Sequence, residues 1–438
     1  MFNNTRALSR ALCLLALVAL STFSFATLVQ AAQADAVVAT SLLRIHSGPL
    51  LTSGVVGTAT QGTQVTLDGR DTGAIWLHGK TDGGVIGWMS RPYLSIRLSL
   101  NVLSLPVLGS NASVSAPVVP TSSAGNTAPV TVAGRLSGAF ELGGQIQDLG
   151  ANTISALNRA GMHWIKRQIG VGDGQSATWI SQAHGAGFKI LLSVKGDKNA
   201  VLNPGYFNQY AGYVATLAQQ GVDAVEVWNE ANLDREWPNG HIDPALYTQL
   251  LAAAYNAIKK TNANTMVISG APSPTGAGVT AAYWNDDVFY AGMARAGAAR
   301  YADCIGAHYN EGIVGPLQTS GDPRDNYPTR YFSTMLARAL ASFPGKKACF
   351  TELGYLTSQG YGSLPNNFSW ARNTTLAQQA TWLAQAAVRA SASGRVRLMI
   401  IWNVDMTYYG PDDPMAGFAM IRPGGGCPAC DSLGQVSH

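Results

Sequence analysis

The sequence predicts an α/β protein, a (β/α)8 barrel of the TIM type preceded by a small all-β domain. In residues 138–438, short apolar runs typical of strands alternate with Ala-rich segments of helical spacing. Eight such runs fall within about 300 residues, which suits a closed (β/α)8 barrel. Residues 36–96, by contrast, contain only short strand-like runs separated by turns.

The composition favours a large buried core and argues against several classes of function. Of the 438 residues, 47% are hydrophobic and 12% are charged, and the formal net charge is +4. The sequence has no basic run, no phosphate-binding loop and no dinucleotide fingerprint after a strand, so we expect neither nucleic acid nor a nucleotide as a partner. The histidines are scattered without a paired ligand spacing, so we expect no metal and no cofactor.

Residues 1–34 have the composition of a signal peptide. Arg6 and Arg10 form a positive region, residues 11–29 are almost continuously apolar, and residues 32–34 supply a small-x-small cleavage site. A membrane anchor is the alternative, because the apolar run is close to the shortest length that spans a bilayer. The cleavage site favours secretion, so we expect an extracellular or cell-envelope-associated protein that leaves the membrane after cleavage.

The cysteines of a secreted protein meet oxidising conditions. Cys13 belongs to the predicted signal peptide and is removed with it. Cys304 and Cys349 each begin an apolar run, and we expect them to be buried thiols. Cys427 and Cys430 follow three glycines, and we expect a local disulfide there rather than a redox site, because no thioredoxin-like unit surrounds them.

Residues 36–96 have alternating apolar positions with Gly and Asp at the turns, which predicts a small β-barrel. The strand-like runs are 43–49, 63–67, 76–79, 85–90 and 93–94. In these runs the segment resembles the bacterial SH3-like domains of secreted and cell-wall proteins. The resemblance implies attachment to a wall or matrix polymer, and a folded spacer without a ligand is the alternative.

Residues 97–137 form a predicted linker. Their composition shifts to Ser, Ala, Val, Pro, Thr, Asn and Gly, with few charges and no helical or strand period in residues 111–130. We therefore expect an extended connection between two folded parts.

The predicted barrel strands are 140–146, 164–169, 189–194, 224–228, 265–270, 304–308, 347–351 and 397–404. Candidate helices between them are 154–160, 206–220, 245–260, 331–342 and 375–393. An open doubly wound sheet is the alternative, but it normally has a glycine-rich phosphate turn after its first strand, and residues 145–148 read Gln-Ile-Gln-Asp. The segment after the last strand is short, so we expect an incomplete eighth helix.

Two glutamates follow strand-like runs of this predicted barrel. Glu230 comes after the fourth run and Glu352 after the seventh, and active sites of (β/α)8 barrels lie where strands end. Either residue alone would more often be a surface residue or an ion-pair partner. Together they suit glycoside hydrolysis, in which one carboxyl group protonates the leaving oxygen and the other attacks the sugar carbon. A barrel mouth can supply the spacing of about 5–5.5 Å that retaining enzymes use, whereas inverting enzymes leave room for a water.

Three motifs around these glutamates carry a family resemblance. Residues 228–233 read Trp-Asn-Glu-Ala-Asn-Leu, residues 351–354 read Thr-Glu-Leu-Gly, and residues 401–403 read Ile-Trp-Asn. With them, residues 138–434 resemble the clan A glycoside hydrolases, the cellulase-like and β-xylosidase-like barrels. The resemblance implies a retaining mechanism in which Glu230 is the acid/base and Glu352 is the nucleophile.

The same resemblance implies residues that bind the substrate. Asn229 would hydrogen-bond the sugar 2-hydroxyl at the cleavage point. Trp402 would be the apolar floor beneath that sugar, with a core tryptophan as the alternative. His308 would orient the nucleophile, with a buried structural histidine as the alternative.

Two further positions concern the surroundings of the nucleophile. Asn310 stands where the family usually has a tyrosine that contacts it, and Tyr309 should point the other way. Lys166 fits the family's basic residue near the nucleophile better than Arg167 does. Such a cation would keep Glu352 ionised, whereas Glu230 must hold a proton, so we expect its site to raise its pKa.

Aromatic residues in the strand loops are candidates for sugar stacking, with ordinary loop packing as the alternative. They are Trp237, Tyr283, Trp284, Tyr408 and Tyr409.

The sequence thus predicts a secreted retaining β-glycoside hydrolase that cleaves a β-linked polysaccharide by double displacement. The alternative is a non-catalytic carbohydrate- or cell-wall-binding protein on a glycosidase-like barrel. A third hypothesis keeps the catalysis but makes the bacterium's own envelope or matrix polysaccharide the substrate.

Overall fold

The computed structural model describes residues 34–39, 42–49, 53–71, 76–97, 100–108, 132–276, 278–407 and 413–438. These residues form two compact units, of which the first contains strands β1 to β7 and the second strands β8 to β15. Nearly all of the predicted signal peptide and most of the predicted linker lie outside the described residues.

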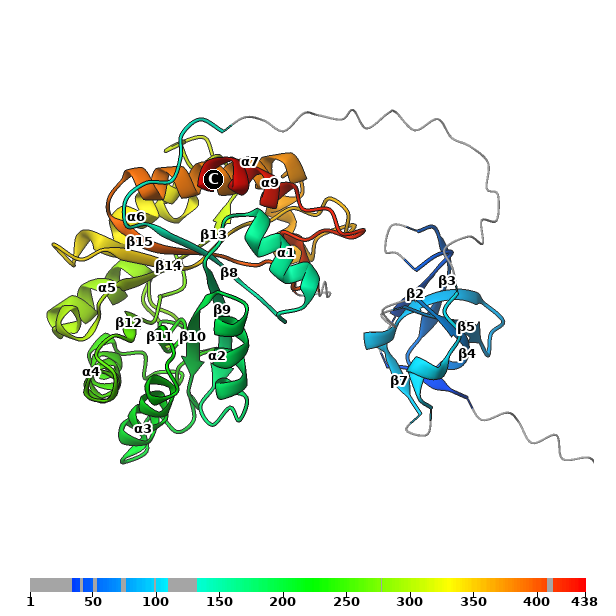
Figure 1. Ribbon diagram of the computed structural model, residues 1–438, viewed down its shortest axis with the longest axis horizontal. Helices are drawn as coiled ribbons and strands as arrows, with labels where there is room; N and C mark the ends of the chain where they lie inside the picture. Colours follow the sequence, from blue (N-terminus) through cyan, green and yellow to red (C-terminus); the bar gives the residue numbers. More distant parts are fainter. Residues whose placement is uncertain are drawn as a thin grey trace, which may run out of the picture. The chain divides into compact units, whose positions relative to one another are not determined.

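The first unit, coloured blue to cyan in Figure 1, is a small antiparallel sheet of the SH3-like kind. Its strand order is β3-β2-β6-β5-β4-β1-β7. In β4, buried and exposed residues alternate, because successive side chains of a strand point to opposite faces. The core includes Ile45, Val65, Leu77 and Met89. The strands are β1 (Ala36–Val38), β2 (Leu42–His46), β3 (Val55–Thr60), β4 (Gln64–Arg70), β5 (Trp76–Thr81), β6 (Ile86–Ser90) and β7 (Leu94–Ile96).

The second unit is built on eight parallel strands in the order β12-β11-β10-β9-β8-β15-β14-β13. A parallel bridge between Ile268 and Cys304 joins the two end strands and closes the sheet into a barrel. All eight predicted barrel strands are present, which confirms the predicted fold class. They are β8 (Glu141–Gln145), β9 (Trp164–Gly170), β10 (Lys189–Lys195), β11 (Ala224–Val227), β12 (Met266–Ser269), β13 (Ile305–Gly312), β14 (Ala348–Tyr355) and β15 (Val396–Ile401).

The closure of the barrel depends on a glycine. A Cβ atom added to Gly306 would lie 2.0 Å from the Ser269 carbonyl oxygen. Because glycine has no Cβ atom, the two strands can approach closely at this point. The backbone NH of Gly306 donates a hydrogen bond of 3.0 Å to Ser269 Oγ. A larger residue here would push β13 away from β12.

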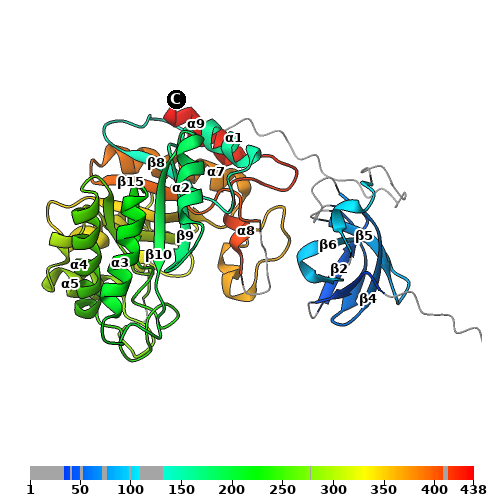
Figure 2. The same cartoon turned by 60° about the horizontal axis from the view of Figure 1, so that its bottom comes forward.

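Helices surround the barrel strands, and α3, α4 and α5 lie next to one another outside them (Figure 2). The five predicted helices are present. The prediction omitted α2 and α5. The helices are α1 (Ala151–Arg159), α2 (Ser176–Gly185), α3 (Tyr206–Gln219), α4 (Pro244–Thr261), α5 (Asp286–Arg295), α6 (Phe332–Ala341), α7 (Leu376–Ala392), α8 (Met415–Phe418) and α9 (Pro428–Ser437).

The expectation of an incomplete eighth helix was wrong. Helix α9 has ten residues and packs against α1 and α7, so it completes the outer ring. It begins at Pro428, a residue suited to the first turn of a helix because the first amides need no partner there. The run of three glycines in front of it hid this start in the sequence.

The interior of the barrel has an apolar layer below the site. Its members come from six of the strands and from Cys304, which precedes β13: Trp164, Leu191, Ala224, Met266, Ile268, Cys304, Cys349, Leu398 and Ile400. Such layers of inward-facing side chains fill small parallel barrels. They leave only the carboxyl ends of the strands for polar groups.

Cys304 and Cys349 form a disulfide in this layer, so the expectation of two buried thiols was wrong. The cysteines stand on neighbouring strands with their Cα atoms 5.8 Å apart, within the usual range for a disulfide. Cys427 and Cys430 form a second disulfide, as predicted.

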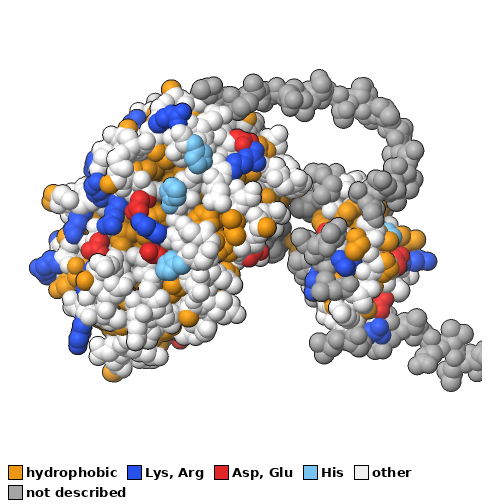
Figure 3. Space-filling view, viewed as in Figure 1, with side chains coloured by type: hydrophobic (Ala, Val, Ile, Leu, Met, Phe, Trp, Pro, Cys, Tyr) orange, Lys and Arg blue, Asp and Glu red, His pale blue; other side chains and the backbone are white. Residues whose placement is uncertain are grey.

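On the face shown in Figure 3, basic and acidic side chains of the barrel unit are interspersed with apolar and uncharged ones. Among the residues that the model describes, no helix combines the length and hydropathy of a membrane span.

Candidate active site

The strand β11 ends abruptly, and this end presents the first glutamate. Trp228 and Glu230 have positive φ angles of 72° and 42°, a conformation that side chains rarely adopt and that breaks the strand. The turn is held on both sides: Trp228 NH donates to the Val194 carbonyl (3.1 Å) and Glu230 NH donates to the Ala271 carbonyl (3.0 Å). Asn229 and Glu230 are thereby fixed at the carboxyl end of the barrel, and both are buried.

Glu352 lies in β14, a strand that is buried along its whole length. Lys166 Nζ donates to Glu352 Oε1 (3.1 Å), and Asn310 Nδ2 donates to Glu352 Oε2 (3.2 Å). Arg167 points to the outside of the barrel, where its guanidinium lies 3.7 Å from the ring centre of Trp179. Lys166 is therefore the basic residue beside this carboxylate.

A third carboxylate, Glu226, belongs to the same cluster and was not predicted. It is fully buried, lies 3.3 Å from Lys166 Nζ, and accepts a hydrogen bond of 2.6 Å from Thr351 Oγ1. Burial alone would raise the pKa of Glu226, but the charges of Lys166 and His308 outweigh burial and lower it. The signal was a lone charge inside an apolar strand, which is rarely buried unless it is paired.

His308 connects the two predicted catalytic carboxylates. Its Nδ1 atom lies 3.0 Å from Glu230 Oε1 and 3.9 Å from Glu352 Oε2. The carboxylate oxygens are therefore no farther apart than the sum of these distances. The hydrogen bond goes to Glu230, whereas the sequence predicted an orienting contact with Glu352.

His308 is itself electrostatically perturbed. Burial lowers its pKa, but the nearby carboxylates of Glu352, Glu230 and Glu226 outweigh burial and raise it. Its Nε2 atom has no hydrogen-bond partner among the described residues.

The second oxygen of Glu230 is taken by an arginine that the prediction did not include. Arg235 Nη2 forms a hydrogen bond and an ion pair with Glu230 Oε2. Burial would raise the pKa of Glu230, but His308 and Arg235 lower it to about 2. The expectation that the site raises this pKa was wrong for the ligand-free protein, because two cationic groups face the carboxylate.

Several polar atoms at the strand ends are buried and lack a partner among the described residues: Gln145 Oε1, Asn229 Oδ1 and Asn310 Oδ1. Buried polar atoms are normally hydrogen-bonded, so unpaired ones beside two carboxylates suit a bound polar ligand.

Trp402 follows β15 and is partly exposed, with its ring 4.7 Å from that of Phe418. The peptide bond between Trp402 and Asn403 is cis. Tyr309 is buried and donates to the Arg330 carbonyl, away from Glu352, as predicted.

The aromatic candidates for sugar stacking differ in exposure. Trp237 is fully buried against Trp228, which agrees with the packing alternative and excludes sugar stacking for this residue. Tyr283 and Trp284 are partly exposed. Tyr408 and Tyr409 lie outside the described residues.

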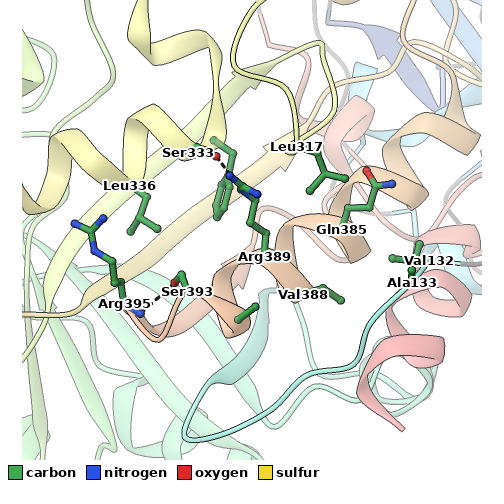
Figure 4. A pocket seen from close by; sticks show the side chains of 12 residues that line it. Val132, Ala133, Leu317, Ser333, Leu336, Gln385, Val388, Arg389, Ser393 and Arg395 are labelled. Carbon is green, nitrogen blue, oxygen red and sulfur yellow. Dashed lines mark hydrogen bonds between the residues drawn. The ribbon is translucent and has the colours of Figure 1, made fainter.

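Other features of the barrel unit lie away from the cluster. Within the described part of the chain, no group of three or more His, Cys, Asp or Glu residues is arranged to hold a metal ion. A cavity of about 570 Å³ lies on the outer wall beside α6 and α7, where Arg389 donates to Ser333 Oγ (Figure 4). None of the predicted site residues lines it.

Comparisons with known proteins bear on both units. Residues 41–95 match the family model of the bacterial SH3 domain. No curated protein matches the chain.

Solved structures of several glycoside hydrolases are similar to this chain, and three of them are compared here with it. A family 39 enzyme from Bacteroides cellulosilyticus has 17% identity and a TM-score of 0.48, covering 90% of this chain and 76% of its own. A family 128 endo-β-1,3-glucanase from Sorangium cellulosum has 14% identity and a TM-score of 0.47, and the match covers 68% of this chain and 98% of the glucanase. A family 39 β-xylosidase from Caulobacter crescentus has 19% identity and a TM-score of 0.45, and the match covers 70% of this chain and 72% of the xylosidase.

Proposed function

We propose that this protein is a secreted retaining β-glycoside hydrolase that cleaves a β-linked polysaccharide, with Glu352 as nucleophile and Glu230 as acid/base. The observation that carries the proposal is the bridging position of His308 between two buried carboxylates at the strand ends. The upper limit that this geometry sets on the separation of the two oxygens is compatible with double displacement.

The surroundings of the two carboxylates support their assignment. Lys166 lies on Glu352 and not on Glu230, so a fixed cation stabilises the carboxylate that must stay ionised until it attacks. Glu230 contacts His308 on one side and a solvent-exposed side chain, Arg235, on the other. Glu230 is therefore the carboxylate that can exchange a proton with an entering substrate and later with water.

The chemistry then follows in two steps. Glu352 attacks the anomeric carbon while the bond to the leaving oxygen breaks and that oxygen takes the proton of Glu230. A water molecule next attacks the same carbon, gives its proton to Glu230, and releases Glu352 from the sugar. The product keeps the β configuration, and the reaction consumes one water.

The unpaired polar atoms supply the sugar contacts in this proposal. Asn229 Oδ1 accepts the 2-hydroxyl, an interaction that strengthens in the transition state. Asn310 holds Glu352 through its amide, in place of the tyrosine usual in the family. Trp402 offers its partly exposed ring to the apolar face of the sugar.

The SH3-like unit and the leader complete the proposal. The predicted signal peptide, residues 1–34, directs export of the chain. The SH3-like unit attaches the exported protein to a cell-wall or matrix polymer. The protein then acts outside the cell or at its envelope. The bacterium's own envelope polysaccharide is accordingly one of the candidate substrates.

The test uses the chain from Asp35 onward on a panel of β-linked polysaccharides that includes peptidoglycan. New reducing ends are measured beside a Glu352→Gln variant. Activity on one polymer that disappears in the variant supports the proposal and fixes the substrate. Equal release by both proteins would show that Glu352 is not the nucleophile.

One observation favours a second candidate, a non-catalytic carbohydrate-binding protein. Both oxygens of Glu230 are engaged in the ligand-free protein, and its low pKa disfavours an acid. Binding of a polymer without any new reducing ends, by a folded protein, would support this candidate.

A further inference from the structure

Arg235 covers the solvent side of Glu230, the proposed acid/base. Its side chain is 68% exposed, whereas that of Glu230 is 9% exposed. It stands in the loop that follows β11 and also faces Glu236, with Nε 3.5 Å from Glu236 Oε1. The guanidinium therefore spans from solvent to a buried carboxylate.

This position conflicts with catalysis in the ligand-free arrangement. Glu230 Oε1 is bound by His308 on the buried side, and Oε2 is bound by Arg235 on the solvent side. His308 is fully buried and cannot withdraw. A leaving group that approaches Glu230 from solvent therefore meets Arg235 first, and this places Arg235 on the leaving-group side of the scissile bond.

Displacement costs the guanidinium its contact with Glu230 and leaves it with Glu236 alone, whose Oε1 lies 3.5 Å from Arg235 Nε. Hydrogen bonds to charged groups are among the stronger ones in proteins, so the loss is costly unless the ligand replaces the partner. A neutral hydroxyl replaces it poorly, whereas a ligand carboxylate can form the same paired hydrogen bonds with arginine. Glu236 is an existing partner of Arg235 rather than a new one, and it shares its charge with Lys195, which lies 2.7 Å from Oε2.

The neighbouring charges support an anionic ligand at this place. Lys195 is partly exposed at the end of β10, and Lys198 Nζ donates to the Asp234 carbonyl (2.8 Å) in the same loop as Arg235. Three basic residues thus adjoin the entrance to Glu230. Of the acidic residues in these loops, Glu236 is buried, Asp234 is partly exposed and accepts from Asn239, and Asp197 is exposed.

We propose that Arg235 is a specificity-determining residue that selects substrates with an acidic group, such as the carboxylate of a uronic acid, on the leaving-group side. The inference rests on the proposed function and names its substrate class. The acidic group of the substrate replaces Glu230 as the ion-pair partner of Arg235.

The exchange also prepares Glu230 for its role. The charged groups that face it are His308 and Arg235, with Glu352 on the far side of His308. When Arg235 turns to the substrate carboxylate, one of the two cations that lower the pKa of Glu230 is neutralised. The substrate itself then favours the protonated acid that its cleavage requires.

The test compares two aryl β-glycosides with the same sugar, chosen as the sugar that the polysaccharide panel identifies. One has a phenyl and the other a 3-carboxyphenyl leaving group, whose phenols ionise at nearly the same pH. The kcat/KM ratio for the pair is measured at low salt in the wild type, in Arg235→Gln and in Arg295→Gln. Arg295 is an exposed residue of α5 on the outer wall and serves as the matched control.

We expect the wild type and Arg295→Gln to prefer the carboxylated glycoside by about tenfold, which is the effect of one charge-assisted hydrogen bond. In Arg235→Gln the ratio falls to about one, and the alkaline limb of kcat/KM moves to higher pH because a cation has left Glu230. A ratio near one in the wild type, or a preference that survives in Arg235→Gln, overturns the inference. Hydrolysis of the neutral glycoside, absent in Glu352→Gln, tests the proposed function separately.

Discussion

Lys166 and Glu226 form an ion pair of 3.3 Å in which both side chains are completely buried. The same ammonium group lies 3.1 Å from Glu352, so one cation serves two carboxylates. Burial lowers the pKa of Lys166, but the two carboxylates outweigh burial and raise it. The proposed nucleophile is therefore held by a charge network that lies beneath the substrate.

Removal of the Glu226 charge should destabilise the protein strongly. We expect Glu226→Gln to lower the free energy of unfolding by about 2 kcal/mol, because the buried Lys166 keeps Glu352 but loses one of its two charged partners. Urea unfolding measures this effect. Glu141→Gln is the control, since its pair with Lys189 is on the surface and should contribute less than about 1 kcal/mol. Equal losses in the two variants would contradict the role of the network.

The two glutamates should respond differently to azide. In Glu230→Ala, activated aryl glycosides still form the glycosyl-enzyme, and azide should attack it to give the β-glycosyl azide. In Glu352→Ala, azide should attack the substrate from the opposite face to give the α-glycosyl azide. Nuclear magnetic resonance distinguishes the products. The reverse outcome would exchange the two roles.

The acid/base should also contribute to the pH dependence of stability. The folded-state pKa of Glu230 is lowered from 4.5 to about 2, so its ionised form stabilises the protein above pH 4.5, and this contribution is lost as the pH falls towards 2. We expect the stability of the wild type to fall more steeply over this range than that of Glu230→Gln. Parallel pH profiles of the two proteins in urea unfolding would show that the carboxylate is not perturbed.

The two disulfides should differ in their effect on stability. Cys304 and Cys349 are 45 residues apart, and Cys427 and Cys430 are 3 apart. In the chain-entropy description, replacing the first pair by alanine costs about 4 kcal/mol and the second about 1.5 kcal/mol. Thermal and urea unfolding of the two double variants test this order.

The barrel was predictable because its strands are short and apolar and alternate with segments whose apolar residues recur at helical spacing. Glu230 and Glu352 were predictable because each follows such a strand within a distinctive motif. Glu226 was missed because a strand pattern does not show which interior charges have partners. Arg235 was missed for another reason: it lies in a loop, and its contact with Glu230 depends on the turn at Trp228.

The Cys304–Cys349 disulfide was missed because adjacency in a closed barrel does not follow from separation in the chain. Strands β13 and β14 are neighbours, and their register sets Gly306 opposite Cys349, two residues beyond Cys304. Only the assembled sheet reveals that distance.

The burial of this disulfide makes it an internal reporter of motion. Both sulfur-bearing residues are sealed in the apolar layer at the base of the barrel, with no exposed surface. A thiol reductant can reach them only when neighbouring strands separate. The rate of reduction in native buffer would then measure how often the barrel opens, and its dependence on bound oligosaccharide would show whether a ligand at the mouth slows movement at the base.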